Sequence, residues 1–264
     1  MIKRMLYQFP LSLYCEKTRW HLEMKGIDFT CRNMIPGLHA VPAWLMAQQT
    51  SLPIFSDDKV TIGDSTKIAL YLEKNYTQFP LLPSDEAQRK QILEREDWFD
   101  ELGDHVRRVC WSKFISSSNI VDIFFNFEGY SPFQQFLTKY NQGILRLMLR
   151  HTLKIYPEQV EISQQWLNDS LIQIEKWLDG NPDNYLVGNT FTLADLTAAS
   201  MLAPLIEPDN THGQTVIYHM KQNKYVKKSE IVLQLNGYYA YTTNIAKLNH
   251  FINFMLKRKI KCQN

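Results

Sequence analysis

A serine stands near the N-terminus of the chain where a strand-like run gives way to a helix-forming one. The strand-like run ends in Phe9-Pro10-Leu11-Ser12, and residues that favour helix formation follow from Tyr14. A hydroxyl at such a junction can cap the helix. It can also donate a hydrogen bond to a sulfur anion, beside the positive potential of the helix N-terminus. Ser12 is therefore a candidate for stabilising a thiolate.

The size of these effects is sufficient. A thiol with a pKa of about 8.5 needs about 2.7 kcal/mol to become mostly ionised at neutral pH. A hydrogen bond to a charged group supplies about 1.5–3 kcal/mol, and the helix terminus adds about 0.3–1 kcal/mol. No general base is required, although a plain helix cap remains the alternative interpretation of Ser12.

A second candidate is the run Gly63-Asp64-Ser65, which opens another helix-forming segment. The Ser65 hydroxyl and the free amides at a helix start can receive a carboxylate. Asp64 can pair with an ammonium group. An ordinary N-cap is the alternative interpretation of this run as well.

Metal and disulfide chemistry have no support in the sequence. The seven histidines show no His-x-x-x-His spacing, and the four cysteines are scattered without a Cys-x-x-Cys pair. The formal net charge of +2 gives no strong field for nucleic acid. The sequence lacks a run of about 18 apolar residues and an N-terminal signal-peptide pattern, so we expect a cytoplasmic protein without a membrane span.

The elements that must position these residues alternate in the first third of the chain. We expect them at 3–9 (strand), 14–25 (helix), 27–34 (strand), 41–48 (helix), 52–55 with 59–62 (hairpin) and 65–75 (helix). The initial strand-helix-strand unit requires a parallel crossover, and the hairpin adds antiparallel strands. This order predicts a thioredoxin-like α/β domain.

The rest of the chain is predicted to be all-helical. Two prolines within residues 79–83 indicate a stiff linker. We expect helices at 87–114, 133–155, 159–178 and 192–203, a break at 124–132, and a helical tail at 229–258 interrupted near Gly237. The expected buried stripe of the helix at 159–178 is Ile162, Trp166, Leu171, Ile174 and Leu178. The predicted division is a first domain at 1–79, a linker at 80–84 and a helical domain at 85–264.

A capping box is expected at the start of the helix near residue 192. Thr192 can cap the helix while Asp195, three residues on, reaches back to it. We give this pair a structural role only.

Four features in this order carry a resemblance to the cytosolic glutathione transferases. They are the Ser12 turn, Leu52-Pro53, Asp64-Ser65 and the Thr192 box. The chain resembles the Ser- and Cys-type, bacterial-like members, with an atypical second domain. The resemblance implies a thioredoxin-like N-terminal domain and an all-α C-terminal domain.

The resemblance also implies roles for these residues. Ser12 would stabilise the glutathione thiolate, Leu52 and a cis Pro53 would align the tripeptide, and Asp64 with Ser65 would hold its γ-glutamyl group. It implies a homodimeric detoxification transferase that uses glutathione as co-substrate, needs no metal and attacks an apolar electrophile. Three stretches depart from the family pattern. They are residues 47–51, where Gln49 or Thr50 could still touch the ligand backbone, residues 114–157, which could shape the second pocket, and the residues after Pro204.

Three residues compete with Ser12 within the resemblance. Cys15 stands where redox relatives carry a second cysteine, but Ser12 replaces the attacking one, so a buried helix position is expected. Tyr7 lies late in the first strand, near the place where Tyr-type relatives carry their hydroxyl, and Tyr14 lies closer to the turn. Two other functions stay open: a non-catalytic binding protein on the same fold, and a glutathione-dependent thiol reductase using Cys15.

Overall fold

The N-terminal part of the chain forms a four-stranded sheet. The computed structural model describes residues 4–116 and 131–205. The strands are β1 (Arg4–Gln8), β2 (Thr30–Asn33), β3 (Ile54–Asp57) and β4 (Val60–Gly63). They lie in the order β2-β1-β3-β4, with β1 parallel to β2 and the other pairs antiparallel. The prediction of a thioredoxin-like domain is confirmed.

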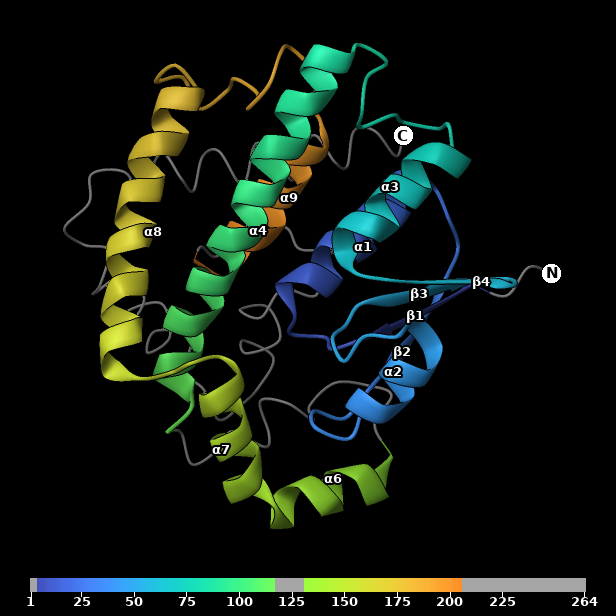
Figure 1. The fold of residues 1–264 in the computed structure, drawn as a ribbon, viewed down its shortest axis with the longest axis vertical. Coiled ribbons are helices and arrows are strands. Elements are labelled where there is room, and N and C mark those ends of the chain that lie inside the picture. The colour runs from blue at the N-terminus through green and yellow to red at the C-terminus, as the bar shows by residue number, and fades with distance from the viewer. Residues whose placement is uncertain (1–3, 117–130, 206–264) are drawn as a thin grey trace.

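Three helices cover the two faces of this sheet. They are α1 (Leu13–Met24), α2 (Ala40–Ala47) and α3 (Ser65–Asn75). Figure 1 shows α1 and α3 on one face and α2 on the other. An apolar cluster of Leu6, Leu22, Phe55, Ile68 and Leu72 joins β1 and β3 to α1 and α3. This cluster fixes the starts of both helices relative to the strands.

The strand register brings the candidate loops together at one end of the sheet, where β1 and β4 end and β3 begins. Tyr7 pairs with Ile54, and Ile54 pairs with Gly63. The turn after β1, the loop before β3 and the start of α3 therefore all lie at the same end of the strands. The residues predicted to handle glutathione come from these three connections.

The helical part contains one long central helix. Its elements are α4 (Glu86–Phe114), α6 (Pro132–Tyr140), α7 (Gln142–Thr152), α8 (Pro157–Trp177), α9 (Leu193–Leu202) and a 3₁₀ turn (Ala203–Leu205). In Figure 1, α4 lies between α8 and α9, and α9 packs against α1. Trp20 and Ala69 of the first domain belong to the same apolar core as α4, α8 and α9.

Two sequence predictions are wrong in detail. The single helix expected at 133–155 is two helices, because Asn141 leaves the helical conformation (φ −111°, ψ 23°) and starts α7 anew. Asn and the nearby Gly143 are poor helix formers. Ile162, expected in the buried stripe of α8, is 44% exposed. The break expected at 124–132 lies largely, and the tail at 229–258 entirely, outside the described residues.

The buried face of α8 contains two serines beside the expected Leu171 and Ile174. Ser163 and Ser170 are fully buried, and each hydroxyl donates to the carbonyl oxygen four residues earlier at 2.7 Å. Small side chains satisfied in this way allow close helix packing without a polar penalty. The apolar pattern therefore places most of this face correctly, but it overlooks the buried serines and is wrong at Ile162.

Candidate functional site

Ser12 is the N-cap of α1. Its backbone is extended (φ −84°, ψ 127°), and its Oγ accepts a hydrogen bond from the Cys15 N–H at 3.4 Å. The side chain is half-buried. Because Oγ uses a lone pair for the cap, its proton stays available to an acceptor in front of the helix.

A cavity of about 320 Å³ opens in front of Ser12. The first domain supplies one wall, and α4 and α7 supply the other. Its lining residues are Phe9, Leu11, Ser12, Leu13, Tyr14, Pro36, His39, Thr50, Ser51, Leu52, Arg107, Trp111, Met148, Leu149, Thr152 and Leu153. The segment that departs most from the family pattern thus contributes four of these residues. Such a largely apolar space with a few polar groups is typical of small-molecule sites.

The loop beside the cavity is fixed to the start of α3. The Leu52–Pro53 peptide bond is cis. The Pro53 carbonyl accepts from the Gln49 side-chain amide and from the Asp64 N–H, both at 3.3 Å. A Cβ on Gly63 would lie 2.2 Å from the Gln49 side chain, so the contact requires glycine there. Gln49, predicted to touch the ligand, is directed at its own loop.

The start of α3 is capped by its own acidic residue. Asp64 has a positive φ of 74°, and its carboxylate accepts from the Thr66 and Lys67 N–H groups at 3.0 Å. Two of the amides expected to bind a carboxylate are therefore occupied. Ser65 is buried, and its hydroxyl makes no hydrogen bond within the described part of the chain.

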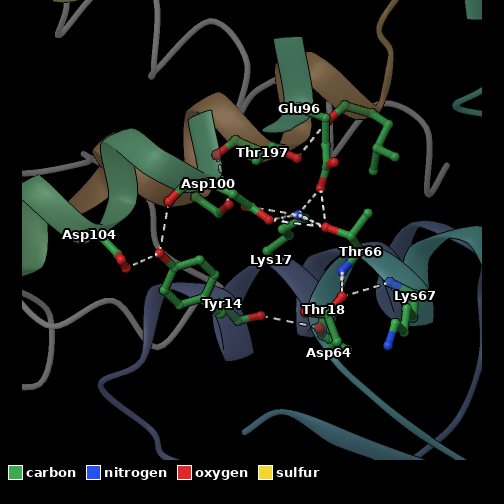
Figure 2. Close-up of polar contacts among 12 residues, drawn as sticks. Tyr14, Lys17, Thr18, Asp64, Thr66, Lys67, Glu96, Asp100, Asp104 and Thr197 are labelled. Atoms are coloured by element: carbon green, nitrogen blue, oxygen red, sulfur yellow. Dashed lines mark hydrogen bonds and ion pairs between the residues drawn. The ribbon is translucent and has the colours of Figure 1, made fainter. Parts of the chain in front are cut away.

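A buried charge cluster joins both helix starts to α4, as Figure 2 shows. Lys17 of α1 is 1% exposed and forms ion pairs with Glu96 and Asp100, the latter at 2.9 Å. Thr66 of α3 donates toward Glu96 at 2.7 Å and lies 3.0 Å from Asp100. We call these four residues the Lys17 cluster. It sets the position of α1 and α3 against the helical part.

The two carboxylates of the Lys17 cluster share one cation. Burial raises the pKa of Asp100 to about 6, and the charge of Glu96 adds to this effect. Lys17 and Thr66 oppose it by stabilising the ionised form. The Asp100 carboxyl consequently takes up its proton at a higher pH than an ordinary aspartate does.

Tyr14 faces α4 instead of the space in front of Ser12. Its hydroxyl lies 2.6 Å from the Asp104 carboxylate and 2.8 Å from the Asp100 carbonyl oxygen (Figure 2). Burial and the Asp104 charge raise the pKa of Tyr14. The ring borders the cavity, but the hydroxyl proton is already donated.

Cys15 and Tyr7 do not border the cavity. Cys15 is completely buried, as expected, and burial raises the pKa of its thiol against the effects of Arg19 and Ser12. Tyr7 packs with the apolar cluster beside α2, with the Arg32 guanidinium 5.9 Å from its ring centre. Neither group is placed to meet a ligand sulfur in the cavity.

Several cavity residues were missed by sequence reasoning. Arg107 and Trp111 lie one turn apart on α4, and His39 precedes α2. Arg107 pairs with Asp104 at 3.0 Å and lies over the Tyr14 ring. The four-residue spacing of Arg107 and Trp111 places them on one side of a helix, which is the signal that could have found them.

The described residues form neither a metal-binding cluster nor a membrane-spanning helix. They contain no group of three or more His, Cys, Asp or Glu side chains arranged to hold a metal ion. None of their helices combines the length and the apolar character that crossing a membrane requires.

Residues 6–80 match the family model described as "Glutathione S-transferase, N-terminal domain". A glutathione S-transferase 1 from Dianthus caryophyllus is 33% identical over 90 residues, which are 33% of this chain but only 41% of that protein. The glutathione S-transferase TCHQD of Arabidopsis thaliana is 27% identical over 76% of each chain.

A solved structure shares the fold. The beta-etherase LigF from Sphingobium sp. strain SYK-6 has a TM-score of 0.59 at 19% identity and covers 97% of this chain and 99% of its own. At that identity the likeness concerns the fold alone. It confirms the predicted pairing of a thioredoxin-like domain with a helical one. The bacterial-like character inferred from the sequence stays a prediction.

Proposed function

We propose, from the premise that the chain belongs to the cytosolic glutathione transferase superfamily, that it binds glutathione and activates the thiol for attack on an apolar electrophile. The observation that carries this proposal is the position of Ser12. Its hydroxyl caps α1 and borders a cavity that the first domain shares with α4 and α7.

In the proposed reaction, bound glutathione loses its thiol proton to solvent. The Ser12 hydroxyl then donates a hydrogen bond to the sulfur anion, and the α1 N-terminus adds positive potential. The sulfur electron pair forms a bond to an electrophilic carbon of the second substrate. The leaving group departs with the electron pair of the bond that breaks.

The tripeptide would lie at the end of the sheet where the turn after β1, the loop before β3 and the start of α3 meet. The backbone of Leu52 is proposed to pair with it as an added strand. Ser65, whose hydroxyl has no hydrogen-bond partner among residues 4–116 and 131–205, would receive the γ-glutamyl carboxylate, and the exposed Asp64 carboxylate would meet the ammonium group. Gln49 would act indirectly, by holding the Pro53 carbonyl.

The apolar electrophile would occupy the part of the cavity walled by α4 and α7. Trp111 and Leu153 supply apolar surface there, and Arg107 supplies a cation. We further propose that the protein is a cytoplasmic, homodimeric detoxification enzyme. Its first domain would be residues 1–79, its linker residues 80–84 and its helical domain residues 85–264. Thiol reduction through Cys15 is not proposed, because the thiol is buried.

The decisive experiment compares Ser12→Ala with Ser12→Asp. In Ser12→Ala we expect the pKa of bound glutathione to rise by about 1–2 units and kcat/KM to fall about 10–100-fold, because one charged hydrogen bond is lost. Thiolate absorbance titration and a conjugation assay measure these quantities. Ser12→Asp keeps a good helix cap but cannot donate to a thiolate.

If Ser12 were a cap and nothing more, Ser12→Asp would restore activity together with stability. Recovery of thiolate formation in that variant would remove Ser12 from the mechanism. Failure of the native chain to be retained on immobilised glutathione would instead favour a non-catalytic interaction protein on the same fold.

A further inference from the structure

The most exposed apolar side chains of the described surface gather at one end of the molecule. Nine large ones are 57–73% exposed, whereas the next, Ile172, reaches 50%. The nine are Leu38, Val41, Trp44, Leu45, Phe133, Phe136, Tyr140, Ile144 and Leu147; we call them the apolar face. Apolar residues scattered singly are normal on a surface, but a cluster of this kind marks an interaction site.

Helical spacing accounts for the cluster. The exposed apolar positions follow i, i+3, i+4 in α2, i, i+3, i+7 in α6 and i, i+3 in α7. Each helix therefore directs one apolar stripe to solvent. In α6 the Phe136 and Tyr140 rings lie 4.5 Å apart, so the stripe is continuous.

The three helices lie at the same end of the fold, as Figure 1 shows. The loop before α2 touches α7, because a Cβ on Gly37 would lie 3.0 Å from the Met148 sulfur. His39 and Met148 line the cavity together. The apolar face therefore borders the candidate site.

The two stretches of chain that carry the apolar face contain charges of one sign. Residues 29–56, which contain α2, and residues 131–157, which contain α6 and α7, include no Asp or Glu. Lys139, Arg150 and Lys154 of the second stretch are exposed. Exposed apolar stripes flanked by Lys and Arg without carboxylates are typical of helices that lie on a membrane surface.

We propose that the apolar face docks on the surface of an anionic lipid bilayer. The aromatic and aliphatic side chains would enter the headgroup boundary, and the basic side chains would meet lipid phosphates and carboxylates. A second copy of the chain fits less well. A two-fold interface would bring the basic groups against their own copies, with no carboxylate from either stretch to offset them.

The test is co-sedimentation of the full chain with vesicles. We expect binding to mixed phosphatidylcholine and phosphatidylserine vesicles, weaker binding to phosphatidylcholine alone, and release by salt. Substituting Trp44→Ser, Phe136→Ser and Leu147→Ser together should reduce partitioning at least about tenfold. Substituting Lys139→Gln, Arg150→Gln and Lys154→Gln together should reduce it on the order of 100-fold.

The matched control is Ile162→Ser with Ile172→Ser on α8, which removes exposed apolar side chains away from this face. It should bind vesicles as the native chain does. Absence of native binding, or equal loss in the control, would overturn the proposal. If the native chain bound no vesicles and the triple variant with Trp44→Ser changed from dimer to monomer, the apolar face would instead be an interface between two copies.

Discussion

At the residue scale, the start of α1 places three candidate groups within four positions. Ser12 lies at the helix tip and borders the cavity, Tyr14 donates its hydroxyl to α4, and Cys15 lies one turn inward in the core. Sequence spacing cannot separate them, because all three are close to the turn. Burial and hydrogen-bond partners separate them at once, and both favour Ser12.

Ser65→Ala should weaken glutathione binding without changing the chemical step. Loss of one hydrogen bond to a carboxylate corresponds to about 1.5–3 kcal/mol, or roughly a 10–100-fold rise in KM for glutathione. The value of kcat should stay within about twofold, because binding is lost equally in ground and transition states. Steady-state kinetics with glutathione as the varied substrate measures both.

Ser84→Ala is the control, since Ser84 is exposed in the linker and should leave both constants unchanged. An unchanged KM in Ser65→Ala would mean that the ligand carboxylate binds elsewhere. A fall in kcat alone would give Ser65 a different role from the one proposed.

At the scale of the elements, local sequence patterns predicted the positions of most helices and strands in the first domain and of α4. The strands, α1, α3 and α4 fall within a few residues of their predicted ranges, since each has its own apolar period and its own stop signal. The capping box is also present: Asp195 accepts from the Thr192 N–H at 2.8 Å. The cis peptide at Leu52–Pro53 followed from the family resemblance.

Long-range packing was beyond the sequence pattern. Lys17 reads as an ordinary exposed helix residue, yet it is buried because α1, α3 and α4 meet around it. Met148 reaches the cavity from a helix about 130 residues further along the chain than the Ser12 turn. Such contacts depend on how helices pack, which no local period encodes.

The Lys17 cluster should carry much of the stability of the boundary between the two parts. Lys17→Met removes the cation that faces Glu96, a carboxylate with no exposed surface. An uncompensated buried charge costs about 3–5 kcal/mol. Urea denaturation of the native and variant chains would show this as a large fall in the transition midpoint.

Lys90→Met serves as the matched control. Lys90 is 79% exposed and pairs with Glu94 at 3.9 Å, so its loss should cost at most about 0.5 kcal/mol. Adding Glu96→Gln to Lys17→Met should recover part of the lost stability, because no charge is then left unpaired. Equal effects of Lys17→Met and Lys90→Met would show that the cluster is not a stabilising unit.

At the scale of the whole molecule, one apolar core crosses the predicted domain boundary. Leu11 and Trp20 from the first domain pack in the same core as Phe99 and Leu196. The cavity lies along this boundary and takes residues from both sides. A change of pH that loosens the boundary should therefore alter stability and the site together.

Asp100→Asn should remove part of the pH dependence of stability. The pKa of Asp100 is raised from 3.8 to about 6, so between about pH 4 and 6 the folded chain binds more protons than the unfolded one. This contribution to stability is fully present below about pH 4 and is lost as the pH rises through 6. Asparagine imitates the protonated carboxyl and has no such loss.

The measurable quantity is the difference in unfolding free energy between the native chain and Asp100→Asn. Between pH 4 and pH 7 we expect the unfolding free energy of the native chain to fall, relative to that of Asp100→Asn, by up to about 3 kcal/mol. Asp195, whose pKa is also raised to about 6 by burial, is present in both chains and cancels. Asp97→Asn, an exposed change on the same helix, controls for the replacement of aspartate by asparagine. Parallel curves for the native chain and Asp100→Asn would mean that Lys17 keeps Asp100 ionised throughout, and that the charge cluster does not couple the domain boundary to pH.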